Sequence, residues 1–136
     1  MTEALNFTSH AEGKNSIAEG EASHSEGAFT KAKGDFSHSE GYLAESSGNQ
    51  SHAEGYSTSS LGNGSHSEGD STIANSRYSH TEGGRTQTGY TGETNTIQVD
   101  TSEGAAGTYS HAEGNATATY GNAAHAEGRK TFAKGN

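Results

Sequence analysis

All eight histidines of this chain lie in one pentapeptide, Ser/Ala-His-Ala/Ser/Thr-Glu-Gly, which recurs at a fixed step of fourteen residues. A step this regular means that one supersecondary unit is stacked many times. The chain is therefore expected to fold as a solenoid, and the repeat has to be explained before any single residue. The histidines are His10, His24, His38, His52, His66 and His80 and, after a gap, His111 and His125.

Glycine halves this repeat, because it recurs every seven residues along most of the chain. Between glycines, small and larger residues alternate, as in Ser23-His24-Ser25-Glu26-Gly27. Strict alternation that ends in glycine predicts a short strand and then a tight corner, where a Cβ would be unwelcome. The glycines expected at corners are Gly13, Gly20, Gly27, Gly34, Gly41, Gly48, Gly55, Gly62, Gly69, Gly83, Gly114, Gly121, Gly128 and Gly135.

The two faces of such strands differ in kind. Neighbouring strand residues point to opposite faces, so Ser, Ala and Thr fill a thin roll while the larger residues point outward. On one strand of each coil the outward pair is nearly always His and Glu, whereas on the other it varies from Ile17/Glu19 to Phe132/Lys134. We therefore expect the constant face to be an interface and the variable face to be a surface.

The gap between His80 and His111 spans thirty-one residues, which is two periods plus three. Counting back in sevens from the second of these motifs makes 96–100 a strand. Ile97 and Val99 then take the positions that His and Glu hold elsewhere. This register keeps the solenoid continuous through the gap.

Two arrangements of the gap follow from the pattern. In the first, three extra residues near 89–95 lengthen one corner, and nine coils form a single β-roll domain over 9–136 after a lead-in over 1–8. In the alternative, 84–109 is a loop that protrudes from the stack. The Thr-Ile-Gln-Val run favours the first arrangement, because it fits the strand template.

The composition alone would favour disorder. Leu, Ile, Val and Phe together number eleven, against twenty glycines and a formal charge of −9, so little apolar surface can offset the chain entropy. The fixed period overrides that expectation. A thin roll filled with Ser and Ala still buries little apolar area, so a single copy is expected to be marginal and to be stabilised by oligomerisation through its constant face.

Several classes of partner fit this sequence poorly. The chain has no cysteine, so disulfides play no part in its fold. Excess acid without basic clusters argues against nucleic acid and against direct contact with an anionic membrane. No signal peptide is visible, so we expect either a piece of a longer surface protein or a chain that a signal peptide does not export.

The repeat of small-x-small-x-Gly strands, from about Ser9 to Gly135, resembles the head domain of trimeric autotransporter adhesins of the YadA type. The resemblance implies an all-β, left-handed parallel β-roll that assembles as a parallel homotrimer. In that family the corresponding strand reads Asn-Ser-Val-Ala-Ile-Gly, and its two apolar residues face the threefold axis. Similar repeats occur in phage tail and appendage proteins.

Carried over by position, the resemblance implies that this chain lines its trimer axis with imidazoles and carboxylates. Only Ile97 and Val99 would keep the apolar form of the family. The residues placed at the axis are His10, Glu12, His24, Glu26, His38, Glu40, His52, Glu54, His66, Glu68, His80, Glu82, Ile97, Val99, His111, Glu113, His125 and Glu127.

Catalysis is not expected from these motifs. Ser and His are adjacent in nearly every motif, but adjacent strand residues point to opposite faces, so the serine cannot be activated by its own neighbour. Binding of a metal is the alternative, because His-x-Glu brings ligands that suit zinc or nickel to one face. We favour a ladder in which each Glu accepts a hydrogen bond from a His of a neighbouring chain, with no cofactor and no metal.

The expected function is that of a trimeric adhesin head or stalk, on a bacterial surface or a virion, that presents a binding surface to a host or matrix target. A purely structural spacer of a tail fibre or surface fibre is the alternative. The ligand cannot be named from the variable strand, which shows no clustered aromatic or basic site.

Overall fold

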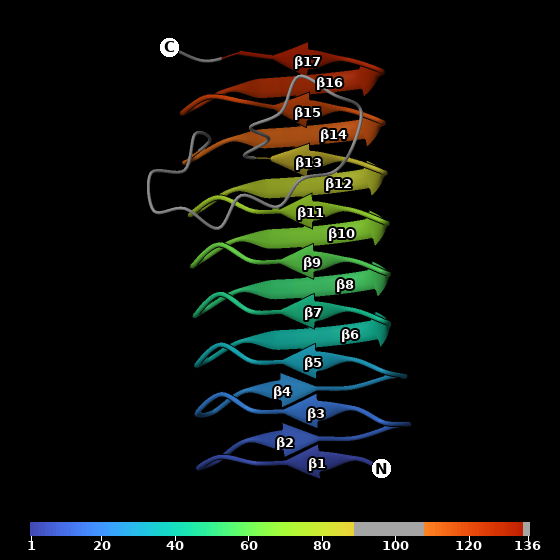
Figure 1. Ribbon diagram of the computed structural model, residues 1–136, viewed down its shortest axis with the longest axis vertical. Helices are drawn as coiled ribbons and strands as arrows, with labels where there is room; N and C mark the ends of the chain where they lie inside the picture. The colour runs from blue at the N-terminus through green and yellow to red at the C-terminus, as the bar shows by residue number, and fades with distance from the viewer. Residues whose placement is uncertain (89–107, 135–136) are drawn as a thin grey trace.

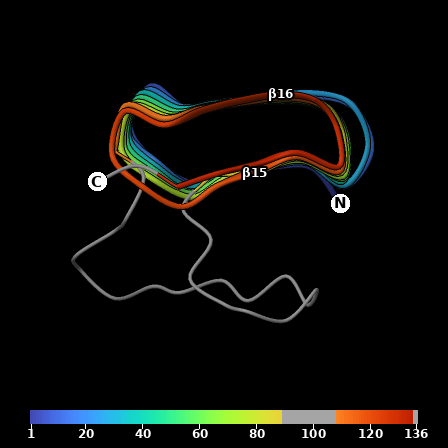
Figure 2. The same ribbon diagram turned by 90° about the horizontal axis from the view of Figure 1, so that it is seen from above.

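The computed structural model describes residues 1–88 and 108–134, which form a parallel β-solenoid of about eight coils (Figure 1). Each coil contributes one strand to each of two sheets, so the strands alternate between the sheets along the sequence. The view down the stack shows the two sheets lying close together across a thin interior (Figure 2). The all-β solenoid with fourteen-residue coils that the repeat predicts is thereby confirmed.

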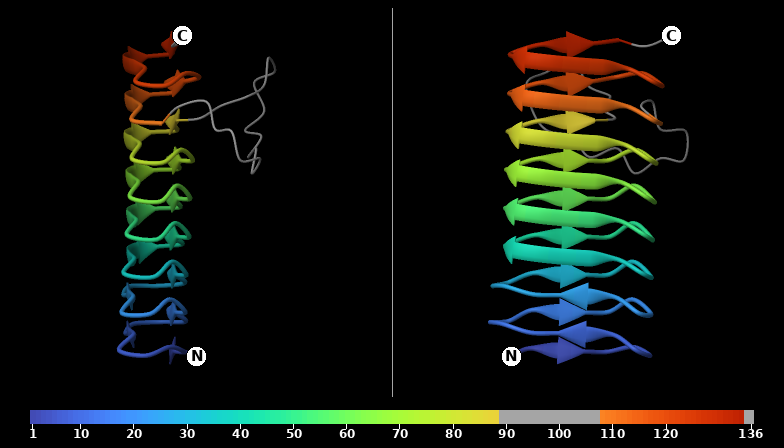
Figure 3. Two further views of the ribbon diagram at one scale, coloured as in Figure 1. Left: turned by 90° about the vertical axis from the view of Figure 1, so that its left-hand side faces the viewer. Right: turned by 180° about the vertical axis from the view of Figure 1, so that it is seen from behind.

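The eight-stranded sheet carries the histidine motifs and is called the histidine sheet below; the nine-stranded sheet is called the variable sheet (Figure 3). The histidine sheet contains β2 (His10–Ala11), β4 (His24–Ser25), β6 (His38–Tyr42), β8 (His52–Tyr56), β10 (His66–Asp70), β12 (His80–Gly84), β14 (His111–Asn115) and β16 (His125–Arg129). The variable sheet contains β1 (Glu3–Ala4), β3 (Ile17–Ala18), β5 (Lys31–Ala32), β7 (Glu45–Ser46), β9 (Ser59–Ser60), β11 (Ile73–Ala74), β13 (Gln87–Thr88), β15 (Ala118–Thr119) and β17 (Phe132–Ala133).

The N-terminal end of the stack and the ends of its strands differ in detail from the expected boundaries. The lead-in expected over 1–8 contains β1, which pairs in parallel with β3, so the stack already begins within that segment. In six coils the strand of the histidine sheet also continues one residue past its corner glycine, as in β6. Gly135 lies outside the described residues.

The gap between His80 and His111 is not arranged as the sequence register predicted. Strand β12 pairs directly with β14, and the His80 N–H donates to the Ser110 carbonyl at 2.9 Å. Parallel strands joined in this way lie about 4.8 Å apart, so no coil fits between them. The expected place of 96–100 in the stack, and the count of nine coils, are therefore wrong; Ile97 and Val99 themselves lie outside the described residues.

The physical reason for this error is register. The direct pairing sets two copies of the same motif side by side over five residue pairs, including His80 with His111 and Gly83 with Gly114. It therefore preserves both the histidine stack and the corner conformation. A strand over 96–100 would have matched only the alternation of small and large residues.

The interior of the roll is filled by small residues, as the alternation predicted. Buried Ala, Ser and Thr line it, and Ala32, Ala53 and Ala74 are completely inaccessible to solvent. Hydroxyl groups bond across this interior, for example Ser25 Oγ to Thr30 Oγ1 at 2.9 Å. Such bonds matter because a buried hydroxyl without a partner costs about 1–3 kcal/mol.

The serine before each histidine has a second role that the pattern did not reveal. Its hydroxyl donates to the carbonyl three residues earlier, as Ser37 does to Gly34 at 2.6 Å and Ser51 does to Gly48 at 2.6 Å. The backbone N–H of Ser37 points to the same carbonyl at 3.3 Å. A serine fastens the turn in this way at each strand of the histidine sheet from β2 to β12, whereas Ala124 precedes His125 of β16.

Glycine is required at the two corners of a coil for two different reasons. Gly27 has a φ of +105°, in the region that side chains with a Cβ rarely adopt. Gly34 has no such φ, but a Cβ there would lie 2.1 Å from the backbone oxygen and 2.4 Å from the backbone carbon of Gly48 in the next coil. At Gly34 the backbone of the next coil therefore approaches too closely for a side chain.

Each corner also contains a residue in the left-handed region that is usually not glycine. The φ of Phe29 is 60° and that of Leu43 is 57°, and each such residue costs about 1 kcal/mol or more. The Phe29 N–H donates to the Lys14 carbonyl at 2.8 Å, and the Leu43 N–H donates to the Ala28 carbonyl at 3.0 Å. The strained conformation thus keeps the hydrogen-bond ladder between coils unbroken around the bend.

These left-handed residues recur every seven positions among the described residues, and no sequence signal marks them, because their side chains share no type. They are Thr8, Asn15, Ala22, Phe29, Phe36, Leu43, Gln50, Ser57, Ser71, Tyr78, Arg85, Tyr109, Ala116, Ala123 and Lys130.

Replacing a corner glycine should damage the fold far more than replacing an exposed strand residue. In Gly27→Val the new Cβ would lie 2.2 Å from the Gly41 oxygen, so we expect a loss of at least about 3 kcal/mol in the free energy of unfolding. Lys31→Val, on an exposed strand position, should change it by less than about 0.5 kcal/mol. Urea unfolding of both variants would check this, and equal losses would contradict the assignment of the corner.

Relief of left-handed strain should stabilise the roll. Leu43→Asn places a residue that tolerates this conformation at a half-exposed position, and we expect a gain of up to about 1 kcal/mol in the free energy of unfolding. Lys31→Asn is the control, because an ordinary strand position disfavours asparagine. Thermal unfolding should move the two melting temperatures in opposite directions; a shift in the same direction would argue against stored strain.

Candidate functional site

The histidines form one continuous column along the outward side of the histidine sheet, which is called the histidine face below. Parallel pairing in register sets each histidine directly above the previous one, as with His52 on His38. The ring centroids of successive histidines lie 4.7–5.0 Å apart, from 4.7 Å between His80 and His111 to 5.0 Å between His111 and His125. The rings are nearly parallel, so the column is a true stack.

The glutamates of the motif flank this column on one side. The His52 Nε2 lies 3.6 Å from the nearest carboxylate oxygen of Glu40, which belongs to the preceding coil. The His111 Nε2 instead lies 3.5 Å from Glu113 of its own coil. The glutamates therefore interact with histidines of both their own coil and the next, a pairing between coils that the His-x-Glu spacing did not reveal.

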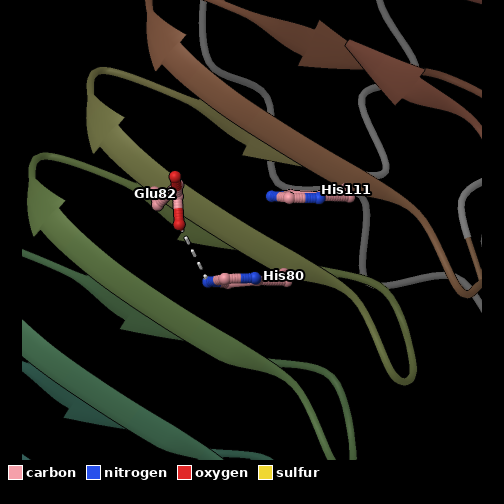
Figure 4. Close-up of side chains that lie close together, drawn as sticks. All are labelled: His80, Glu82 and His111. Atoms are coloured by element: carbon pink, nitrogen blue, oxygen red, sulfur yellow. Dashed lines mark ion pairs between the residues drawn. The ribbon is translucent and has the colours of Figure 1, made fainter. Parts of the chain in front are cut away.

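One part of the column shows this arrangement directly. Figure 4 shows the parallel rings of His80 and His111, with a nitrogen of each at the side where Glu82 lies. The His80 Nε2 is 3.8 Å from Glu82 and 3.5 Å from Glu68. Each imidazole nitrogen thus lies between two carboxylates of successive coils.

These imidazole nitrogens are shielded from solvent but form no hydrogen bonds. In the described part of the chain, Nε2 is buried and has no hydrogen-bond partner in His24, His38, His52, His66, His80 and His111. The whole side chains are less enclosed: that of His52 is 36% exposed and that of Glu40 is 34% exposed. The column is therefore half-covered by its own chain, with its polar edge left unpaired.

The stack also acts on its own protonation. Burial, and then the charges that His38 and His66 would carry, lower the pKa of His52, although Glu54 and Glu40 oppose the shift. A stack of imidazoles at this spacing therefore favours neutral rings, because each protonated ring would repel the next.

The same holds at the other end of the column. Burial and the neighbouring His80 lower the pKa of His111, while Glu113 raises it and His125 adds a smaller lowering effect.

The corner glycines beside these glutamates leave a shallow groove along the column. It is lined in one stretch by Glu12, Gly13, Glu26, Gly27, Glu40 and Gly41, and a second stretch continues over Glu40, Gly41, Glu54, Gly55, Glu68 and Gly69. The groove gives another molecule access to the carboxylates from the side.

The variable sheet offers no comparable array. Its outward residues differ from coil to coil, and the Lys33 ammonium donates to Glu45 at 2.8 Å. Burial alone would raise the pKa of Glu45, but hydrogen bonds from Lys33 and Ser47 lower it below its usual value. The contrast between a constant face and a variable one, expected from the sequence, is therefore present in three dimensions.

Aromatic side chains also gather at one corner, which the sequence pattern did not indicate. Tyr42 and Tyr56 stack with ring centroids 5.3 Å apart, and Phe29 meets Tyr42 edge to face at 5.8 Å. The spacing of Tyr42 and Tyr56 by fourteen residues is the signal that could have revealed this stack.

No protein-family model and no curated protein matches this chain. The described residues include no helix of the length and hydrophobicity needed to cross a membrane. The site therefore has to be interpreted from its own geometry.

Acid should destabilise the roll as soon as its histidines protonate. The folded pKa values of His52 and His111 lie below the unfolded value of 6.5, so their contribution is complete above pH 6.5 and is lost as pH falls through the folded values. Urea unfolding between pH 7.5 and 5 would measure this decline.

The matched variant for this test is His52→Phe combined with His111→Phe, which keeps flat rings in the stack but removes two protonation sites. Its free energy of unfolding should depend less on pH than that of the parent over the same window. A dependence as steep as the parent's would show that the stacked rings are not the source.

Proposed function

We propose that this chain assembles through its histidine face as a parallel homotrimer, and that the trimer forms the head or stalk of a fibre on a cell surface or a virion. The observation that carries the proposal is the histidine column, whose buried Nε2 atoms have no hydrogen-bond partner within the described residues. Buried polar atoms in native proteins nearly always find partners, so this face has unused bonding capacity that a bound molecule can engage.

A second copy of the chain is the partner that suits this face best. The column repeats one His and one Glu at every coil, with rings 4.7–5.0 Å apart. Only a surface with the same repeat can match each layer in turn, and another copy aligned in parallel has that repeat. A carboxylate of one copy would then accept the N–H of an imidazole of another.

The number of copies and the hand of the coil rest on the resemblance of the repeat to YadA-type heads. It supports three copies around an axis and a left-handed β-roll. The His/Glu pairs would then occupy the positions that apolar residues hold at the axis of that family. A thin roll with a core of Ala, Ser and Thr gains from such assembly, because one copy alone buries little apolar surface.

Within this assembly the variable sheet and the corners face outward, and they supply the surface that a host or matrix ligand would meet. This supports an adhesin head or stalk rather than an enzyme, a nucleic-acid-binding protein or a protein in direct contact with a membrane. A structural spacer is the second candidate, because the variable sheet carries mixed residues and no dense cluster. We place the trimer outside the cell or on a virion.

Light scattering of the chain after gel filtration tests the assembly. We expect a mass three times the chain mass of 14.0 kDa. The variant His38→Asp/His52→Asp/His66→Asp adds like charges to the proposed interface and should shift the mass to the monomer. Lys31→Asp/Ser59→Asp, on the variable sheet, is the control and should leave the trimer intact. A folded, monodisperse monomer of the parent chain would refute the proposal.

Binding to arrays of glycans and matrix proteins separates the two candidate functions. Saturable binding by the trimer, weakened by substitutions on the variable sheet or at the corner of Tyr42 and Tyr56, would favour an adhesin head. A trimer that binds none of these surfaces would favour the spacer.

A further inference from the structure

Three donor groups converge at successive layers of the histidine face. Nε2 of His52 and one carboxylate oxygen each of Glu40 and Glu54 all lie within 4.8 Å of one another. Groups of three such donors recur along the column in two forms, one with two glutamates and one with two histidines, and successive groups share a residue. They include Glu12/His24/Glu26, Glu26/His38/Glu40, Glu40/His52/Glu54, His80/Glu82/His111 and His111/Glu113/His125.

The distances within these groups decide between a hydrogen bond and a shared ion. The closest nitrogen–oxygen separations are 3.5 Å, between His80 and Glu68 and between His111 and Glu113. A hydrogen bond from a ring N–H needs about 2.7–3.2 Å, so none is formed. Two ligands of a tetrahedral zinc ion, each about 2.1 Å from the metal, stand about 3.4 Å apart. The shortest separations match that edge, and the longest of these nitrogen–oxygen separations, 4.0 Å between His24 and Glu26, needs only a small side-chain shift to reach it.

The charge of the groups points the same way. Three of the five groups named above combine one imidazole with two carboxylates, and the other two combine two imidazoles with one carboxylate, so every group offers at least one carboxylate to a cation. A divalent cation within a group would offset the carboxylate charge and would satisfy the buried Nε2 atoms. Mixed nitrogen and oxygen donors suit transition metals such as zinc, whereas calcium and magnesium prefer sites made of oxygen alone.

We propose that the histidine face binds a row of divalent transition-metal ions, each held by imidazole nitrogens and carboxylate oxygens from successive coils. Glutamates such as Glu26 and Glu40, which belong to two groups each, bridge neighbouring ions. The groove beside the column gives the ions their way in. All these ligands belong to one chain, so the site does not depend on the homotrimer proposed above; a second copy or water completes each coordination shell.

Zinc binding by the intact chain tests this proposal. The protein is stripped with a chelator and titrated with ZnCl₂ in a calorimeter, and its zinc content after dialysis is measured by elemental analysis. We expect more than one zinc ion per chain and no comparable heat with MgCl₂. One ion per chain or fewer, or equal binding of magnesium, would overturn the proposal.

A matched pair of variants locates the ions. Glu26→Gln/Glu40→Gln keeps the side-chain shape but removes a carboxylate from three of the five groups named above. Its zinc content should fall by about a third or more. Glu45→Gln alters a half-buried glutamate of the variable sheet and should leave zinc content unchanged. Circular dichroism in chelator confirms that both variants are folded, and equal zinc content in the two would contradict the assignment.

X-ray absorption at the zinc edge adds a readout that needs no variant. We expect a first shell of nitrogen and oxygen at about 2.0–2.1 Å, with the outer-shell scattering of imidazole. A shell of oxygen alone would place the zinc on other carboxylates and would overturn the proposal. Light scattering of the chain after zinc titration distinguishes this inference from the trimer: a trimer that takes up no zinc would refute the ion row alone, and a monomer that binds zinc would refute the trimer alone.

Discussion

The hydrogen-bond ladder between successive coils is the interaction on which the rest of this structure depends. It runs through the strands, where the Ile17 N–H donates to the Thr30 carbonyl, and continues through the corners, where the Phe29 N–H donates to the Lys14 carbonyl. Since every coil is bonded to the next along nearly its whole path, all coils must follow one backbone course. Each left-handed corner residue costs about 1 kcal/mol or more, and its hydrogen bond contributes a similar amount. Successive coils therefore keep the same length. Gly34 has no room for a side chain, because the backbone of the next coil lies against it.

The same ladder makes the interior too thin for large side chains. The buried positions hold Ala, Ser and Thr, so the structure depends on hydroxyl bonds such as Ser67 to Thr72 at 2.7 Å as well as on apolar packing. Serines before the histidines, such as Ser51 and Ser65, donate their hydroxyl hydrogen bonds to carbonyls in the turns. A roll with so little apolar surface has reason to cover its outward faces with another molecule.

Stacking in register forces identical side chains into contact, and the histidine face shows what this does to charge. Protonated rings about 5 Å apart would repel one another strongly. Burial lowers the pKa of His52, and this repulsion from the neighbouring rings lowers it further. Carboxylates of successive coils also repel one another, and a neutral imidazole carries no positive charge that would offset this repulsion. This repulsion can be offset by protons, by bound cations or by complementary groups of another copy. The three cases are distinguished by pH dependence, by metal content and by the mass in solution, respectively.

The sequence by itself determined the solenoid, the coil length, the small-residue interior and the pairing of a constant face with a variable one, because alternation of two and a period of fourteen leave few ways to fold. It did not determine the register across the gap: the alternation at 96–100 imitated a strand, whereas the direct pairing of His80 with His111 preserves the whole motif. It also left hidden the left-handed corner residues, such as Leu43, because that conformation is imposed by the ladder and not by the side chain. Finally, only the tertiary structure decided that Glu40 lies against His52 of the next coil, since the separation between coils, and not the spacing within a strand, sets that distance.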